Sequence, residues 1–333
     1  MNKKAFEVQF NWIFVLIAGA AILLFFTVIV IKQKGVAETS TKATILKSIE
    51  AIITGAGVST DTTNIISIPS SDIDISCNRV SLGIVSKQHE NLILFAPSLV
   101  KGDKLITQTM SFNVPYRATN FLFITSPQLR YIIIGSSSLA KEINRTLPSD
   151  LKKEFYPQIQ EIKNSNNYRI RFIILSDMVE FPESLAKMPD FDVTAIKING
   201  DIEKGTLEFW QKDRTSWQAK GSAPYIGKAS LIGAVYTDDL EMYNCNMQNA
   251  FSRLNLVTKI YIDKTKKLVQ KESVSASQIQ CNQFYNNGLA QLSGIFSASS
   301  SFSHQNVNVI SDSAKSLAGE NKNAQIFSCT LIY

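Results

Sequence analysis

Four polar residues follow short apolar runs that are typical of β-strands. Ser126 ends "FITS", Ser136 and Ser137 follow "YIIIG", and Asp177 ends "IILSD". Ligands of open α/β sheets bind outside the carboxyl ends of parallel strands, and free N–H groups between a strand and a helix can hold an anion. A ligand site at Ser126, Ser136, Ser137 and Asp177 is therefore one interpretation. Ordinary helix capping by the same residue types is the interpretation we prefer.

The sequence contains none of the stronger catalytic motifs. It has no G-x-G-x-x-G, no G-x-x-x-x-G-K-[ST], no G-x-S-x-G and no H-E-x-x-H. Its two histidines, His89 and His304, lie in polar stretches that indicate surface positions. We therefore predict no catalytic residue, no metal site and no cofactor, and we leave enzymatic activity open while favouring its absence.

The segment from Trp12 to Ile31 contains 20 residues without a charge. At ~1.5 Å per residue, a helix of this length covers the roughly 30 Å hydrocarbon core of a bilayer. Trp12 at one edge and Lys32 and Lys34 at the other are typical of membrane interfaces. A cleaved signal has a shorter apolar core of about 7–15 residues. We therefore predict a tail over 1–9 and a retained single-pass anchor over 10–34 that contacts membrane lipid through 12–31; a cleaved signal and a buried core helix are the alternatives.

Basic residues on both sides of the anchor give only a weak indication of its orientation. Lys3 and Lys4 precede it, and four lysines follow it closely: Lys32, Lys34, Lys42 and Lys47. This balance favours a cytoplasmic C-terminal part.

The cysteines favour the opposite side of the membrane. The chain has four of them, and none lies in a C-x-x-C pair: Cys77, Cys245, Cys281 and Cys329. An even number on a chain with an export-type segment indicates two disulfides in an oxidising compartment. We give this argument priority and predict a cell-membrane protein with an extracytoplasmic domain; four buried thiols in a cytosolic domain are the alternative.

Three disulfide connectivities are open. We favour Cys245 with Cys281, and Cys77 with Cys329, because the second pair would join an early strand to the last one. In a simple antiparallel helix hairpin the first pair would lie about 30 Å apart at ~1.5 Å per residue. That pair requires residues 270–280 to run back in an extended conformation.

Periodicity predicts an α/β or α+β fold with a mixed sheet. We expect a stalk helix and linker over 35–70, with the apolar stripe of 42–54 followed by a Ser/Thr-rich stretch over 58–71. Short alternating or continuous apolar runs over 71–237 predict strands, and "ASLIGAVYTDD" is expected to end the sheet. Two helices are expected within this region, at "SSSLAKEINRTL" and over 150–165. A hairpin is expected at Asn199-Gly200.

A helical segment over 238–320 follows. Asp238 and Glu241 have the spacing of a capping box, and apolar residues then recur at steps of three and four. Two further helices are expected near 276–298 and 304–319. The apolar run "AQIFSCTLIY" predicts a final strand, which would make the helices an insertion within one domain over 71–333.

The charge pattern argues against nucleic-acid binding. The net charge is +6, but the basic residues are scattered apart from "KTKK" at Lys264–Lys267. No arginine-rich stripe or basic patch with interleaved aromatic residues is present.

Three segments of the chain resemble a group of uncharacterised archaeal single-pass membrane proteins. They are "FEVQFNWIFVLIAGAAILLFF", "NVPYRATNFLFITSPQLRYIIIG" and "MYNCNMQNAFSRL". The resemblance covers most of the chain and implies no particular function. The short tail before an apolar helix is also similar to archaeal pilin-like proteins, whose leader is cleaved just before the apolar run. Here Phe6 to Phe10, with an acid among them, separate Ala5 from Asn11.

The sequence therefore favours a non-enzymatic, membrane-anchored extracytoplasmic domain for binding or assembly, with a protein partner at the cell surface. The first alternative is a membrane-tethered enzyme or ligand-sensing domain that uses the strand-end serines and Asp177. The second is a pilin-like filament subunit.

Overall fold

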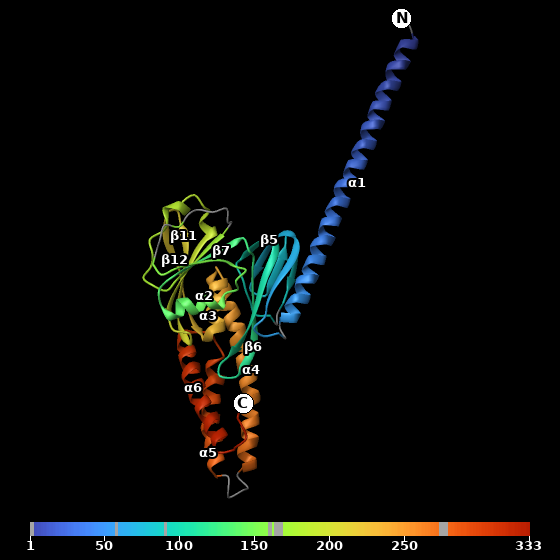
Figure 1. Cartoon of the computed structure of the whole chain (residues 1–333). Coiled ribbons are helices and arrows are strands. Elements are labelled where there is room, and N and C mark those ends of the chain that lie inside the picture. Colours follow the sequence, from blue (N-terminus) through green and yellow to red (C-terminus); the bar gives the residue numbers. More distant parts are fainter. Residues whose placement is uncertain (1–2, 57–58, 90–91, 159–161, 163–168, 273–278) are drawn as a thin grey trace.

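The computed structural model describes residues 3–56, 59–89, 92–158, 162, 169–272 and 279–333. Within these ranges the chain forms a long N-terminal helix, two six-stranded sheets and a bundle of three long helices (Figure 1). The expected combination of an apolar N-terminal helix with a mixed α/β domain is confirmed.

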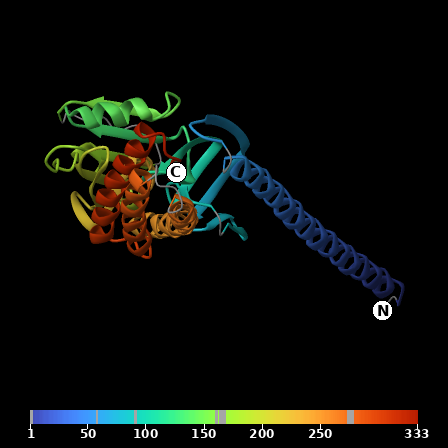
Figure 2. The same ribbon diagram turned by 90° about the horizontal axis from the view of Figure 1, so that it is seen from below.

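Helix α1 runs without a break from Lys3 to Ala56, a length of about 80 Å at ~1.5 Å per residue. Its stretch Leu16–Gln33 is apolar and buries none of its residues inside the protein, and α1 is the helix among the described residues that is long and apolar enough to cross a membrane. The apolar stripe of its last turns packs on the domain, with Ile45, Leu46 and Ile49 buried. One continuous helix therefore joins the apolar segment to the domain, and it projects well beyond the rest of the protein (Figures 1 and 2).

The first sheet carries α1 and is largely antiparallel. Its spatial order is β3 (Val85–Gln88), β2 (Arg79–Leu82), β1 (Thr63–Ser76), β5 (Leu99–Asn113), β6 (Arg117–Thr125) and β4 (Leu94–Phe95). Strand β1 thus begins inside the segment 58–71 that composition suggested was linker. Its pairing with β5 shifts between Ser67 and Ser71, around Pro69, because proline has no N–H for the ladder and is tolerated at a bulge.

The second sheet is mixed. Its order is β12 (Ser216–Ile226), β11 (Lys204–Asp213), β10 (Val193–Gly200), β9 (Arg169–Ile174), β7 (Leu129–Ile134) and β8 (Lys152–Tyr156). Strands β8, β7, β9 and β10 are parallel, and β10–β11 is the expected hairpin. Every residue of β7 and β9 is buried, in agreement with their continuous apolar runs.

Two elements of this region differ from expectation. The helix expected over 150–165 is wrong for its described part, since residues 152–156 form β8, while 159–161 and 163–165 lie outside the described residues. Pairing with β7 overrides the weak helical preference of "KKEFY". The stretch expected as the last strand of the sheet is instead α3 (Gly227–Tyr236), with every residue from Ala229 to Tyr236 buried. A helix covered on all sides has no polar face, so its sequence cannot be told from a buried strand by periodicity.

Three helices follow and pack as a bundle that extends away from the sheets (Figure 1). They are α4 (Leu240–Glu272), α5 (Ile279–Ala298) and α6 (His304–Ile326), as expected. The cap of α4 is Asp239, whose carboxylate accepts from the Met242 N–H at 3.1 Å, and not Asp238. The final strand expected at "AQIFSCTLIY" is wrong: α6 continues to Ile326, and residues 327–333 form a tail that joins neither sheet. The side-chain oxygen of Asn321 accepts from the Ile332 N–H at 2.8 Å and holds this tail against α6.

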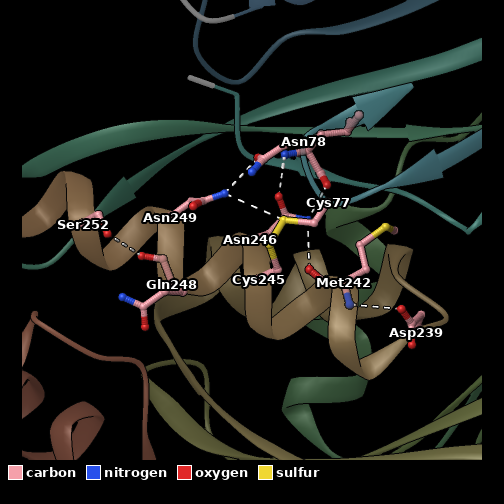
Figure 3. The surroundings of a disulfide bond; sticks show 10 residues. Cys77, Asn78, Asp239, Met242, Cys245, Asn246, Gln248, Asn249 and Ser252 are labelled. Carbon is pink, nitrogen blue, oxygen red and sulfur yellow. Dashed lines mark hydrogen bonds between the residues drawn. A yellow bond between two sulfur atoms is a disulfide. The ribbon is translucent and has the colours of Figure 1, made fainter. Parts of the chain in front are cut away.

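The four cysteines form two disulfides, but the expected pairing is wrong. Cys77, after β1, is bonded to Cys245 on α4, and Cys281 on α5 is bonded to Cys329 in the tail. Cys245 lies near the start of α4 and Cys281 near the start of α5. Because α5 returns antiparallel beside α4 (Figure 1), these two helix starts lie at opposite ends of the pair. The turn after β1 lies against α4 instead, where the Asn249 side chain donates to that of Asn78 at 2.9 Å (Figure 3).

Candidate functional site

The carboxyl ends of three parallel strands meet at one edge of the second sheet. Ile134 of β7 is paired with Ile174 of β9, and β10 lies beside β9 in parallel register. Ser137 and Ser138 follow β7, Leu175 follows β9, and β10 ends at Gly200. This edge is the place where ligands bind in open α/β sheets.

The chain also changes direction at this edge. After β7 it passes through α2 (Ser138–Thr146) to β8 on one side, and after β9 it passes through residues 175–192 to β10 on the other side. Helix α2 packs into the core between the two sheets through Ala140 and Ile143. Residues 175–192 cover the opposite face of the second sheet through Leu185. The boundary between β7 and β9 is therefore a topological switch point, which leaves a crevice between segments that diverge.

A hollow of about 780 Å³ occupies this crevice and opens to solvent. Its volume lies in the range of about 300–1,000 Å³ that is common for small-molecule sites. Apolar and polar side chains share its wall, which consists of Ser137, Ser138, Leu139, Glu142, Arg145, Leu175, Ile198, Asn199, Gly200, Asp201 and Ile202.

Two glycines with positive φ allow the close packing around this edge. Gly135 has φ +147°, and a Cβ there would lie 3.0 Å from the Cβ of Leu175. Gly200 has φ +141°, and a Cβ there would lie 2.5 Å from the carbonyl oxygen of Lys204. A side chain at either position would be strained.

The structure brings one of the four expected ligand residues into the hollow. Ser137 lines it, yet its hydroxyl accepts from the Ala140 N–H at 3.1 Å, so it is also the cap of α2 as the preferred interpretation holds. Ser136 and Asp177 are exposed nearby but do not belong to the described lining. Ser126 is buried before β7, at the opposite end of that strand.

Two carboxylates of the hollow are held in their charged form. Glu142 accepts from Lys228 and Arg145, each at 2.6 Å, and these bonds lower its pKa. Asp201 accepts from the backbone N–H groups of Lys204 at 3.0 Å and Glu203 at 2.7 Å, which lowers its pKa as well. A general acid or base needs a pKa near the working pH. This arrangement is therefore better suited to orienting a bound molecule than to moving protons.

The sequence reasoning missed Glu142, Arg145, Asn199 and Asp201. Asn199-Gly200 was recognised only as a turn signal, although the same two residues end the third parallel strand. Only the strand order β10-β9-β7 brings Asn199 and Gly200 to the edge where Ser137 lies.

A second polar cluster lies at the other end of the parallel strands. Arg169 of β9 is 8% exposed at its side chain and pairs with Asp238, which is equally buried. Asp238 also accepts from the Ser98 N–H at 2.8 Å and the Ser98 hydroxyl at 3.2 Å. Asp192 lies 3.4 Å from Arg169, and burial raises the pKa of its carboxyl. This cluster joins the first sheet, through Ser98, to the second sheet and to the start of α4.

Among the described residues, no group of three or more His, Cys, Asp and Glu side chains is arranged to hold a metal ion. His304 is the exposed first residue of α6, away from the hollow at the strand ends.

Comparison of the chain with models of known protein families, with curated proteins and with solved structures gives no match. The resemblance to archaeal single-pass membrane proteins therefore stays a prediction. The chain is a disulfide-bonded α+β domain on an apolar helix that is long enough to span a membrane.

Proposed function

We propose that this protein is a single-pass membrane protein whose domain lies outside the cytoplasm and binds or assembles with a protein partner at the cell surface, without catalysing a reaction. Membrane lipid surrounds the apolar part of α1, and the domain stands at a fixed distance from the bilayer because α1 is unbroken. Nucleic acid is not among its partners.

The observation that carries this proposal is the pairing of all four cysteines on a chain with an unburied apolar helix. Disulfides of this kind persist in oxidising compartments and are rare in the cytosol. One of them ties the α1-bearing sheet to the helix bundle, and the other ties the tail to α5. The hollow at the switch point supports the proposal of a non-enzymatic domain, because the pKa values of Glu142 and Asp201 are lowered and these groups are poorly suited to general acid or base catalysis.

Cross-linking on intact cells tests the binding role. A lysine-reactive cross-linker that cannot pass the membrane is added to cells that produce the full chain, and the products are identified by mass spectrometry. We expect a protein partner joined to exposed lysines of the bundle such as Lys266 or Lys267. Cross-links that form only after the cells are opened would contradict the proposal.

The hollow favours a second candidate, a membrane-tethered domain that senses a small ligand. Its support is the position of the hollow at the β7/β9 switch point and its mixed apolar and polar wall. In this case the partner is a small molecule, and Ser137 and Ser138 orient it.

Mass spectrometry of molecules released from the purified, denatured full chain tests the second candidate. A stoichiometric ligand is expected from the wild type and is expected to be lost in Ser138→Tyr, which fills the hollow. Ser136→Tyr and Asp177→Ala alter exposed neighbours outside the lining and serve as matched controls. A ligand that survives Ser138→Tyr, or the recovery of none, contradicts this candidate.

A further inference from the structure

The hairpin of β2 and β3 lies alongside helix α1, with its turn directed toward the apolar stretch Leu16–Gln33. Lys87 of β3 is paired with Glu50 of α1, and a Cβ on Gly83, in the turn, would lie 3.2 Å from the Nζ of Lys42. From Glu50 to Lys42 the helix covers about 12 Å at ~1.5 Å per residue. From Lys87 to Gly83 the strand covers about 13 Å at ~3.3 Å per residue. Because the two lengths agree, the hairpin follows α1 toward its apolar stretch.

The turn of this hairpin exposes an isoleucine. Leu82 is paired with Val85, so the turn consists of Gly83 and Ile84. Gly83 has φ +59°, as the first residue of many two-residue turns does, and polar residues or glycine are usual in such turns. Ile84 is nevertheless 87% exposed, a larger fraction than the 70% of Leu23 in the apolar stretch of α1. A single exposed apolar residue is common on protein surfaces, so the position of Ile84 relative to the bilayer decides its meaning.

The distance from this turn to the bilayer follows from the length of α1. Lys42 comes nine residues after Gln33, the end of the apolar stretch, which places its backbone about 14 Å beyond the hydrocarbon core at ~1.5 Å per residue. Long side chains of a helix lean toward its N-terminus, so the ammonium of Lys42, and Gly83 beside it, lie closer than this. The headgroup layer adds roughly 5–7 Å on each side of the core. With α1 upright, the turn therefore lies close to the outer edge of the headgroups.

A tilt of α1 brings the turn into contact with lipid. Helices that span membranes tilt by about 20° on average, and the domain packs on one side of α1, where Ile45, Leu46 and Ile49 are buried. A tilt toward that side moves the hairpin onto the bilayer and moves the opposite face of α1, where Thr44 is exposed, away from it. The helix bundle points away from the apolar stretch (Figure 1).

We propose that the turn between β2 and β3 docks on the membrane surface and that Ile84 inserts its side chain into the headgroup layer of a phospholipid bilayer. The inference rests on the proposed anchoring of α1 in the membrane, and it holds on either side of that membrane. Insertion removes the apolar surface of Ile84 from water and supplies a second attachment beside α1. The two attachments together fix the rotation of the domain about α1, so that the helix bundle is directed away from the bilayer and toward a partner.

Photo-cross-linking of the full chain in phosphatidylcholine nanodiscs tests this contact. The photoreactive residue p-benzoylphenylalanine replaces Ile84, Thr44 or Leu24, one at a time, and lipid adducts are identified by mass spectrometry after irradiation. Thr44 is the matched control, because it lies two residues before the buried Leu46 and therefore on the opposite face of α1, at a height similar to that of the turn. Leu24 lies in the apolar stretch and reports whether α1 is inserted in lipid. We expect lipid adducts at positions 84 and 24 and none at position 44.

The outcomes distinguish a failure of this inference from a failure of the anchor. Adducts at position 24 without adducts at position 84 would overturn the inference and leave the anchor in place. Equal adducts at positions 84 and 44 would also overturn it, because the contact would then not belong to the hairpin turn. Absence of adducts at position 24 would contradict the anchoring of α1 and the inference with it. Because Ile84 is exposed in a turn, the chain substituted there should unfold at the wild-type temperature, which shows that its fold is intact.

Discussion

Cys77, in the turn after β1, is bonded to Cys245 on α4, 168 residues further along the chain, with their Cα atoms 6.1 Å apart. The first sheet carries the end of α1, so this bond fastens the membrane-side part of the protein to the helix bundle. The amide of Asn249 adds a hydrogen bond to Asn78 one turn further along α4 (Figure 3). The disulfide and this hydrogen bond therefore join the first sheet, from the N-terminal half of the chain, to the C-terminal helix bundle.

Loss of this disulfide should destabilise the domain strongly. Replacing Cys77 and Cys245 by serine is expected to lower the free energy of unfolding by about 5 kcal/mol, because the bond closes a long loop of the unfolded chain. The matched control is the Cys281→Ser/Cys329→Ser variant, whose bond spans 48 residues; loop-closure entropy predicts a loss about 1 kcal/mol smaller. Denaturant unfolding measures both, and a larger loss for the shorter loop would contradict the expectation.

Neighbouring aspartates at the start of α4 should differ in their contribution to stability. Asp238 is buried with Arg169, so Asp238→Asn leaves the buried guanidinium with only its longer pairing to Asp192 and should cost about 3 kcal/mol. Asp239 caps α4 at an exposed position, and Asp239→Ala should cost about 1 kcal/mol. Denaturant unfolding of the two variants is the measurement. Equal losses would show that Asp238 is no more than a second cap.

Glu154 should make stability depend on pH in the acid range. Its carboxylate accepts from Nε and Nη2 of Arg130, each at 2.6 Å, and these bonds lower its pKa below the ordinary value. The stabilisation is therefore complete above the unfolded-state pKa of about 4.3 and is lost as the pH falls through the lower folded-state pKa.

The Glu154→Gln variant isolates this effect. It should be less stable than the wild type by about 1 kcal/mol at pH 7, and the difference should shrink as the pH approaches 3. Unfolding temperatures measured from pH 7 to pH 3 test this. A difference that stays constant over that range would mean that the Arg130–Glu154 pair does not depend on the charge of Glu154.

The residues before the apolar run should be retained in the mature protein. A retained anchor predicts that the protein isolated from membranes still contains Lys3 and Lys4 together with the apolar run. A pilin-like subunit would instead begin next to the apolar run, and a cleaved signal would remove that run altogether. Mass spectrometry of the intact protein distinguishes the three, and a mature chain without Lys3 and Lys4 would contradict the anchor.

The elements that could be predicted from the sequence are those whose pattern is local. The apolar stripe of Ile45, Leu46 and Ile49 and the long periodicity of α4 both correspond to helices with one buried face. Helix α3 could not be recognised because it is buried on every side, and β8 because its partner strand lies elsewhere in the sequence.

The candidate site was predictable only in part, for a similar reason. Ser137 was found because it follows a strand and precedes a helix. Glu142 lies one turn after Ser138 on the same helix, so its place beside Ser137 follows from local geometry once that helix is assigned. Asn199 reaches the same hollow only through the order of the strands, which no local pattern contains. The partners of the cysteines depend on the same long-range arrangement.

The side of the membrane on which the domain lies is the central claim, and thiol labelling on intact cells tests it most directly. A reagent that cannot cross the membrane is applied with and without prior reduction, and the labelled cysteines are identified by mass spectrometry. We predict that Cys77, Cys245, Cys281 and Cys329 are labelled on intact cells, and only after reduction. Labelling that requires lysis and needs no reductant would place the domain in the cytoplasm with free thiols, and would contradict both the disulfides and the cell-surface role.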